Sequence, residues 1–212
     1  KIIRNDRDLI VDSSGVCNSQ IPSSLAKELR SSIFLLGSLL SRLKKAKVAY
    51  PGGCDIGLRP IDIHIAGLKE LNIDIQEQGG FIICNSQNAR CADVVLDLPS
   101  VGATENLMMS SVFIKGKTVI RNCAKEPEIV DLQKFLNAMG AKIKGAGSSV
   151  IVVEGVDKLH GVEYTPIPDR IVAGTYLIAT AMCGGNVELR NVNSEHISSL
   201  ISKLSKTTCK IY

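Results

Sequence analysis

Residues 61–75 of this chain read IDIHIAGLKELNIDI, and the pattern recurs in outline at 129–143, IVDLQKFLNAMGAKI, and at 197–211, ISSLISKLSKTTCKI. The apolar positions have the spacing of an amphipathic helix and recur every 68 residues: Ile61, Leu68 and Leu71, then Ile129, Leu136 and Met139, then Ile197 and Leu204, with Thr207 in the third place. Because repetition at a fixed period marks a repeated supersecondary unit, the sequence predicts three copies of one unit.

Each copy contains another helix, which precedes the amphipathic one and is almost wholly apolar. It is expected at 30–42, 103–114 and 170–182. A short strand follows, near 47–49, 118–120 and 187–189. The amphipathic helix comes next, and after it two strands in hairpin-like succession; a further strand, such as 92–96, leads into the next copy. Strands mixed with two helices per copy predict an α/β or α+β fold. A helix that is apolar all round is expected to be buried on every side, so we predict helices inside and sheets outside.

Composition excludes several classes of protein. The 212 residues are 45% hydrophobic and 22% charged, which is typical of a globular chain. A net charge of +4, 4% aromatic residues and no Trp argue against nucleic acid as a partner. No apolar run is long enough to predict a membrane span. Seven cysteines without a CxxC pair argue against a disulfide framework or a zinc site and favour a reducing, cytosolic compartment.

The most unusual segment runs from Tyr50 to His64, YPGGCDIGLRPIDIH, and the corresponding loops of the other copies lack its paired glycines. Arg59 and Pro60 open a helix, whose free amide donors and adjacent cation suit an anion. Positive charge near Cys54 favours the thiolate and a nucleophilic or acid–base role, whereas Asp55 opposes it. Cys54 is therefore either a reactive thiol or, like most cysteines, a buried filler.

Three other segments offer weaker candidates. Ser100 caps a predicted helix start and Gly102 allows close approach, so the junction either binds phosphate or is an ordinary cap. Glu126 and Glu128 suit the first turn of a helix, so an ordinary helix start is favoured over a functional role. His64 lies on the face shared with Ile61 and is either structural or catalytic. No Walker, GxGxxG, HExxH or GxSxG motif is present.

These segments together resemble the UDP-N-acetylglucosamine enolpyruvyl transferases (UDP-N-acetylglucosamine 1-carboxyvinyltransferases). The resemblance rests on residues 51–64, on 99–109 (PSVGATENLMM), on 126–131 (EPEIVD), on 167–171 (IPDRI) and on 30–32 before the first apolar helix. It implies two inside-out α/β domains, each of three βαβαββ-type units. It also implies transfer of the enolpyruvyl group of phosphoenolpyruvate to the 3′-hydroxyl of UDP-N-acetylglucosamine with release of phosphate. That reaction is the first committed step of peptidoglycan and cell-wall synthesis in the bacterial cytoplasm.

The resemblance assigns roles residue by residue. Cys54 matches the loop cysteine that fosfomycin alkylates, and Arg59 would contact both substrates. The remaining substrate-binding positions that it implies are Arg30, Pro60, Ile61, Asp62, Ile63, Ser100, Val101 and Gly102. His64, Glu126, Glu128 and Arg170 are further candidates. Leu98 stands near a position where some members have Lys, and Val172 replaces a usual Glu. Neither a metal nor a cofactor is expected, and no nucleic-acid, membrane or obligate protein partner.

The resemblance also covers only part of the family's length. We therefore expect residues 1–167 to form most of the first domain and 168–212 to begin the second. The family's N-terminal Lys-Asn pair, later aspartate base and C-terminal arginines have no counterpart here, so this chain alone is expected to be inactive. Three other interpretations of the function remain: the shikimate-pathway enolpyruvyl transferase, a catalytically silent paralogue that binds sugar nucleotide, and an interaction domain built from repeats.

Overall fold

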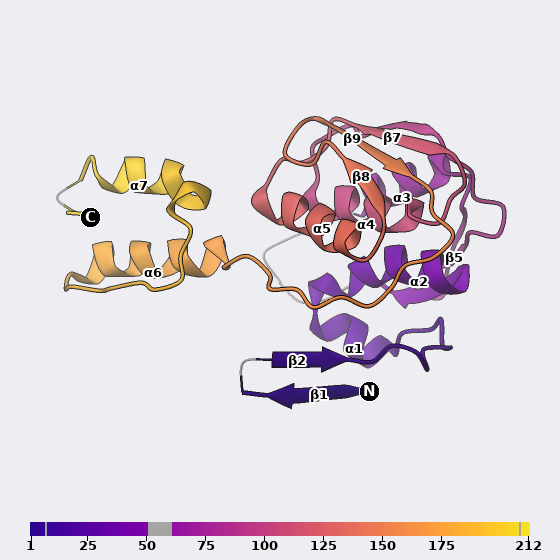
Figure 1. Ribbon diagram of the computed structural model, residues 1–212, viewed down its shortest axis with the longest axis horizontal. Coiled ribbons are helices and arrows are strands. Elements are labelled where there is room, and N and C mark those ends of the chain that lie inside the picture. Colours follow the sequence, from indigo (N-terminus) through magenta and orange to yellow (C-terminus); the bar gives the residue numbers. More distant parts are fainter. Residues whose placement is uncertain (7, 51–60, 208) are drawn as a thin grey trace. The chain divides into compact units, whose positions relative to one another are not determined.

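The computed structural model describes residues 1–6, 8–50, 61–207 and 209–212, and the chain divides into two units, Lys1–Val162 and Glu163–Tyr212 (Figure 1). Each unit is described by itself. None of the helices in the described ranges is long and apolar enough to cross a membrane.

Two sheets of the first unit share one topology, as the repeat predicts. The first has the strand order β3 (Lys45–Ala49), β5 (Phe81–Asn85), β4 (Asp74–Gln78), and both of its pairings are antiparallel. The second has the order β6 (Asp93–Val95), β7 (Lys117–Arg121), β9 (Val150–Glu154), β8 (Lys142–Lys144). Strand β6 runs parallel to β7, and a parallel bridge between Gln20 and Lys47 occupies the same place beside β3. The repeat is therefore confirmed in its strand order.

The helices of the first unit lie inside its sheets. Helix α4 (Val101–Ser111) contacts α2 (Leu35–Leu43), α3 (Asp62–Glu70) and α5 (Pro127–Ala138) (Figure 1). Most of α4 is buried: Ala103, Thr104, Asn106, Leu107, Met108, Ser110 and Ser111. The strands, by contrast, alternate buried and exposed residues, as β7 does, because one face of each sheet meets the helices and the other meets solvent. The predicted inside-out arrangement is confirmed here.

Two glycines allow the neighbouring helices to approach α4 closely. A Cβ on Gly37 of α2 would lie 2.8 Å from the backbone oxygen of Asn106, and one on Gly67 of α3 would lie 2.8 Å from Leu107 Cδ1. Leu107 is fully buried as a result, as are Leu36 and Leu68 on the two flanking helices. Each such side chain contributes roughly 1.5–3 kcal/mol by leaving water.

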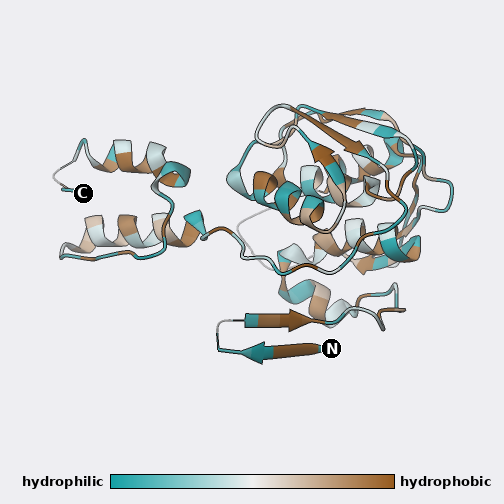
Figure 2. Ribbon diagram, in the orientation of Figure 1, coloured by the Kyte–Doolittle hydropathy of each residue, from teal (hydrophilic) through white to brown (hydrophobic). Residues whose placement is uncertain are grey.

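The first apolar helix is divided. Residues Arg30–Phe34 form a short 3-10 helix, η1, which continues into α2, and α1 (Ser23–Glu28) precedes it. An N-terminal hairpin, β1 (Ile2–Asn5) with β2 (Asp8–Val11), is predominantly apolar yet exposed along both strands (Figure 2).

The second unit departs from the predicted pattern. It contains α6 (Arg170–Cys183), a 3-10 turn η2 (Ser194–Ile197) and α7 (Ser198–Leu204). Helix α6 was expected to be buried on every side, but only Ala173 and Gly174 are buried. The expected strand at 187–189 is also wrong, since the described part of this unit contains no strand. Strands β3 and β7 pair with the hairpins of their own copies, and no such hairpin forms in the described residues after α7.

Candidate functional site

The candidate site lies where α3, α4 and α5 begin. At the start of α4, the Ser100 hydroxyl accepts the Ala103 amide at 3.3 Å, and the Ser100 carbonyl accepts the Thr104 amide at 3.0 Å. The amides of Val101 and Gly102 have no acceptor within the helix, as is general for the first residues of a helix. Such amides, at the positive end of the helix dipole, favour an anion.

Gly102 lets the first turn of α3 press against the first turn of α4. A Cβ at position 102 would lie 3.0 Å from His64 Cε1, 3.2 Å from His64 Nε2 and 3.1 Å from Phe34 Cε1. Real side chains rarely tolerate such distances, so only Gly fits unless the rings move. The sequence predicted that Gly102 lets a ligand approach closely. In the structure the His64 and Phe34 side chains approach it, and the approach of a ligand stays a prediction.

His64 is buried, with 6% of its surface exposed, and its Nδ1 lies 2.9 Å from Asn106 Nδ2. The pKa of His64 is lowered to about 4, mainly by burial and also by the nearby charge of Arg30, while Asp62 acts in the opposite direction. The imidazole is therefore neutral at pH 7. Of the two alternatives left by the sequence, a freely titrating acid–base histidine does not fit this environment.

The other predicted residues of this region lie nearby. Arg30 is half-buried and acts electrostatically on His64, whereas Asp62 is exposed on the first turn of α3. Ile61 is 5% exposed and Ile63 is half-buried. A hollow of about 480 Å³ runs along this side of α3, lined by Tyr50, Ile61, Asp62, Ile65, Ala66, Lys69 and Glu77. Cys54, Arg59 and Pro60, which carry the loop part of the prediction, lie outside the described residues.

The start of α5 adjoins the start of α4. The Ala124 amide donates to the Thr104 hydroxyl at 3.2 Å, which holds the loop before α5 against α4. Glu126 is the N-cap residue of α5 and Glu128 is in its first turn, both half-buried. The ordinary helix-start interpretation of these two acids fits, and they also bring negative charge to this side of the site.

Glu105 is a residue that the sequence interpretation passed over. The pKa of its carboxyl is raised to about 7, mainly by burial and also by the charge of Glu128. The available signal was that Glu105 is the only charged residue of the otherwise apolar or small α4 segment VGATENLMMSS. A carboxyl that titrates near neutrality beside helix starts can exchange a proton at physiological pH.

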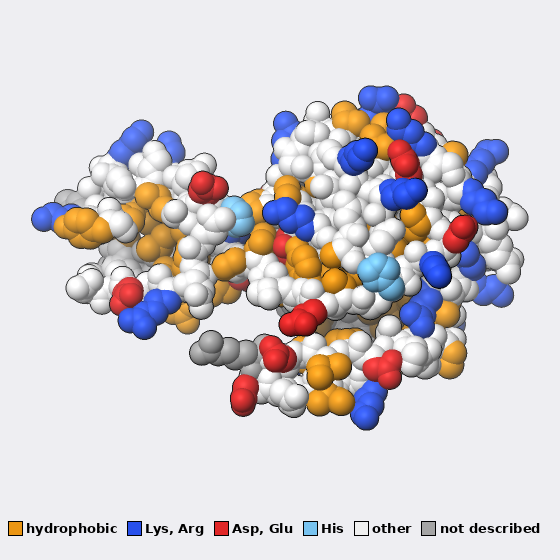
Figure 3. Space-filling model, in the orientation of Figure 1, with side chains coloured by type: hydrophobic (Ala, Val, Ile, Leu, Met, Phe, Trp, Pro, Cys, Tyr) orange, Lys and Arg blue, Asp and Glu red, His pale blue; other side chains and the backbone are white. Residues whose placement is uncertain are grey.

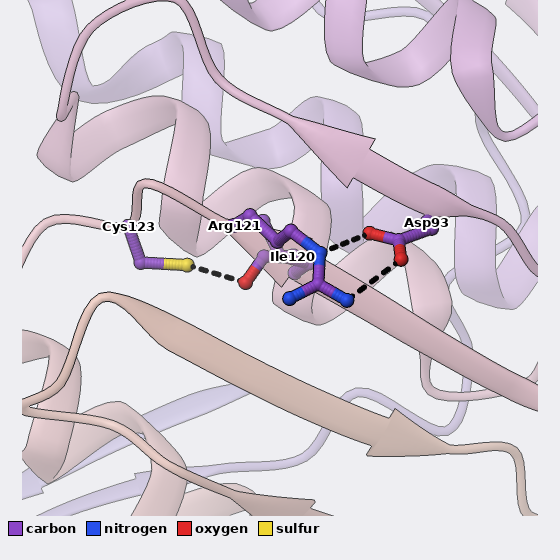
Figure 4. Close-up of polar contacts among 4 residues, drawn as sticks. All are labelled: Asp93, Ile120, Arg121 and Cys123. Atoms are coloured by element: carbon purple, nitrogen blue, oxygen red, sulfur yellow. Dashed lines mark hydrogen bonds and ion pairs between the residues drawn. The ribbon is translucent and has the colours of Figure 1, made fainter.

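Two buried cysteines provide a contrast to the loop cysteine. Cys123 donates to the Ile120 carbonyl at 3.1 Å, beside the exposed ion pair of Arg121 with Asp93 that joins β7 to β6 (Figure 4). Burial raises the pKa of Cys123 to about 11 and that of Cys84 to about 12. Neither thiol forms a thiolate at neutral pH, so both are inert.

Arg170 belongs to the second unit, where it is the first residue of α6. Asp169 caps that helix by accepting the amides of Ile171 at 2.7 Å and Val172 at 3.0 Å. A larger hollow of about 860 Å³ lies in this unit, lined in part by Asp169, Val172, Tyr176 and Arg190. Within the described residues, no three His, Cys, Asp or Glu side chains are grouped as metal ligands would be. Leu98 is 65% exposed.

Comparison with known proteins decides the family. The model of the EPSP synthase (3-phosphoshikimate 1-carboxyvinyltransferase) family matches residues 1–212. The chain belongs to this family. Within it, the chain is 55% identical over 211 residues to "UDP-N-acetylglucosamine 1-carboxyvinyltransferase 2" of Caldanaerobacter subterraneus subsp. tengcongensis, covering 100% of this chain and 51% of the relative. It is 49% identical to "UDP-N-acetylglucosamine 1-carboxyvinyltransferase 1" of Symbiobacterium thermophilum, covering 97% and 47%.

Solved structures show the family fold. The enolpyruvyl transferase NikO from Streptomyces tendae matches with a TM-score of 0.69 at 21% identity, covering 84% of this chain and 43% of that one. EPSP synthase from Acinetobacter baumannii matches with a TM-score of 0.55, also at 21% identity, covering 72% and 35%. The chain spans about half the length of the curated relatives it matches. The predicted α/β enolpyruvyl transferase fold is confirmed.

Proposed function

We propose that this protein acts in the transfer of the enolpyruvyl group of phosphoenolpyruvate to the 3′-hydroxyl of UDP-N-acetylglucosamine, the first committed step of peptidoglycan synthesis. Relatives at 45–55% identity across nearly the whole chain carry the name of that activity. The observation in the structure that supports it most is the junction of α3 and α4, where the Val101 and Gly102 amides lie at a helix start beside the neutral His64 and the cationic Arg30.

The roles of the residues follow from this chemistry. Ser100, Val101 and Gly102 would hold the diphosphate through backbone donors, Arg30 would add positive charge, and Pro60 to Ile63 would contact the uridine. Cys54 and Arg59 would serve the reacting group. The hydroxyl oxygen adds to C2 of phosphoenolpyruvate and gives up its proton to a base while a proton adds to C3, which forms a tetrahedral ketal. Loss of a proton from the C3 methyl group and of phosphate from C2 then restores the vinyl group, so the site needs proton transfer and cations.

The proposal extends to the domain boundary and to the compartment of the reaction. Residues 1–167 would supply most of the cysteine-loop domain and 168–212 the start of the second; the observed division after Val162 lies close to this boundary and supports it. The reaction would take place in the bacterial cytoplasm, where both substrates are found, and would need neither nucleic acid nor membrane.

Fosfomycin labelling tests the proposal directly. The reagent is an epoxide that a thiolate opens: a C–S bond forms, a C–O bond breaks, and the oxygen takes up a proton. The protein is expressed as its natural gene encodes it, treated with fosfomycin and analysed by peptide mass spectrometry. We expect one adduct, on Cys54, which forms faster when UDP-N-acetylglucosamine is present. Cys84 and Cys123 are matched internal controls because their thiols are buried. No adduct on Cys54, or labelling spread over several cysteines, would overturn the proposed loop chemistry.

The shikimate-pathway activity is the second candidate, since the family takes its description from it. Phosphate release from phosphoenolpyruvate with UDP-N-acetylglucosamine and with shikimate 3-phosphate separates the two. We expect turnover with the sugar nucleotide only. If the protein, expressed as its natural gene encodes it, binds UDP-N-acetylglucosamine without turnover, the silent paralogue would be favoured instead.

A further inference from the structure

Asn106 is a fully buried amide in the middle of α4 that joins three segments of the first unit. Its Oδ1 accepts the backbone amide of Gly37 at 2.9 Å. Its Nδ2 donates to the Ile33 carbonyl at 3.1 Å and lies 2.9 Å from Nδ1 of His64. A buried amide with this many partners is held in one orientation, because each lost hydrogen bond would leave an unsatisfied polar group.

The two backbone partners decide which end of the amide is which. A backbone N–H can only donate, so Oδ1 must face Gly37, and a backbone carbonyl can only accept, so Nδ2 must face Ile33. Nδ2 carries two hydrogens. One points to Ile33, and the other therefore points to Nδ1 of His64, which must present a lone pair.

We propose that Asn106 fixes His64 as a neutral imidazole that carries its hydrogen on Nε2. In this state the ring can donate a hydrogen bond from Nε2 and cannot act as the proton acceptor of the site. Protonation of Nδ1 would place an N–H against the Asn106 N–H and break the contact. Asn106 is thus a positioning residue that acts through His64.

The surroundings of His64 act in the same direction. Among the described residues, the charged groups that influence it are Arg30 on η1, which disfavours an imidazolium, and Asp62 on α3, which favours one. Burial adds to the effect of Arg30. The Nε2 edge lies against Gly102, at the start of α4, beside the amides that suit an anion. An Nε2–H donor at this point adds to those amides.

What the donor binds rests on the proposed function: it would meet an anionic oxygen of the ligand held at the start of α4. The assignment of the tautomer does not depend on that function, because it follows from the three hydrogen bonds alone. The two parts can therefore fail separately.

Nitrogen NMR of the chain labelled with ¹⁵N-histidine tests the tautomer while His64 and Asn106 are both left unchanged. The chain has only three histidines, and the His160→Gln and His196→Gln variants identify the signals of the other two rings. We expect Nδ1 of His64 to resonate as an unprotonated nitrogen and Nε2 as a protonated one, unchanged between pH 8 and pH 5. The reverse pattern, a mixture of both tautomers, or titration in that range would overturn the proposal.

The Asn106→Asp variant tests the role of the amide with almost no change of shape. A carboxylate offers only acceptors, so it would draw the proton onto Nδ1 and raise the pKa of His64, by about 1–3 units for an adjacent opposite charge. Neutral His64 would then have its lone pair on Nε2 and could not donate there. We expect the dissociation constant for UDP-N-acetylglucosamine in the variant, relative to that in the parent protein at the same pH, to rise about tenfold or more as pH rises through this new pKa.

Asn137→Asp is the matched control. Asn137 also bonds to backbone: it donates to the Ile143 carbonyl and accepts the Ile143 amide, both at 2.8 Å, and neither of these hydrogen bonds involves His64 or α4. It should leave the His64 signals and the affinity unchanged. A pH-independent affinity in Asn106→Asp, relative to the parent protein, would refute the role of Asn106. Absence of sugar-nucleotide binding in the parent protein, with the expected NMR pattern, would refute the proposed function and leave the tautomer standing.

Discussion

Helices α4 and α6 occupy corresponding places in successive copies of the repeat, yet their surroundings differ completely. Three helices contact α4, and most of its residues are buried. On α6, by contrast, large apolar side chains are exposed: Ile171, Val172, Tyr176, Ile178 and Met182. Figure 3 shows hydrophobic side chains gathered on the visible face of the second unit, over α6 and α7. An apolar sequence therefore predicts that a helix will be buried, but whether it is buried depends on the elements that pack around it.

Truncation of a methionine in each helix tests the difference in burial between α4 and α6 most directly. Met108 of α4 is 0% exposed, whereas Met182 of α6 is 81% exposed. Met108→Ala should lower the free energy of unfolding by about 2–5 kcal/mol, since it leaves a cavity, and Met182→Ala by less than about 0.5 kcal/mol. Denaturant unfolding followed by circular dichroism measures both. Equal losses would mean that α6 is covered in solution.

Two ionisable groups, the buried His64 and the half-buried Glu105, give the first unit a response to pH. The pKa of His64 lies below its unfolded value, so its contribution to stability is complete above pH 6.5 and is lost as pH falls to about 4. The pKa of Glu105 lies above its unfolded value, so stability is highest below pH 4.5 and falls as pH rises to about 7. Each effect reaches about 3 kcal/mol, at about 1.4 kcal/mol per pKa unit, and they oppose each other.

We therefore expect the parent protein to show a nearly flat stability between pH 4.5 and 6.5, and each variant to uncover the remaining group. Glu105→Gln should become less stable as pH falls through that window, and His64→Gln less stable as pH rises through it. Urea unfolding at several pH values measures the slopes. Parallel slopes in the two variants would contradict the assignment of opposite signs.

Replacing one glycine by alanine at a helix contact of each unit is expected to change the free energy of unfolding by a smaller amount. Gly37→Ala would bring a Cβ against the backbone of α4, so α2 must move away, at a cost of about 1–3 kcal/mol. Gly174→Ala on α6 would meet only Leu200 Cδ2, the end of a flexible side chain, at 3.1 Å. It should be neutral or stabilise by up to about 1 kcal/mol through helix propensity. Thermal unfolding of both variants decides. A loss from Gly174→Ala as large as that from Gly37→Ala would show tight packing in both units.

The helix caps give the smallest expected difference. Ser100 accepts one amide at 3.3 Å, whereas Asp169 accepts two at 2.7 and 3.0 Å and adds a negative charge at the helix start. Ser100→Ala should cost about 1 kcal/mol and Asp169→Ala somewhat more, up to about 2 kcal/mol. Amide hydrogen exchange in the first turn of each helix measures the loss locally. The reverse order would show that Ser100 does more than cap α4.

Much of the fold could be predicted because its signals are local. Ser100 and Asp169 mark helix starts through their side-chain oxygens, and the period of 68 residues indicates that β3, β5 and β4 have counterparts in β7, β9 and β8. The site was predicted less completely. Ser100, Val101 and Gly102 could be read as a helix start suited to an anion. The sequence marked Glu105 only as a lone charge in an apolar segment, and its raised pKa could not be predicted because it comes from burial and from Glu128 on another helix.

By itself, the sequence determined the repeat, the helix and strand order of its first two copies and the family, because periodicity, caps and motifs depend on residues close together along the chain. It did not predict the N-terminal hairpin of β1 and β2 or helix α1. Only the tertiary structure decided that α4 is buried while α6 is exposed, since burial depends on which elements surround a helix. It also decided the state of His64. Asn106 lies 42 residues away in the chain, and its amide is oriented by the backbone of Ile33 and Gly37, so the hydrogen on the imidazole depends on contacts that exist only after folding.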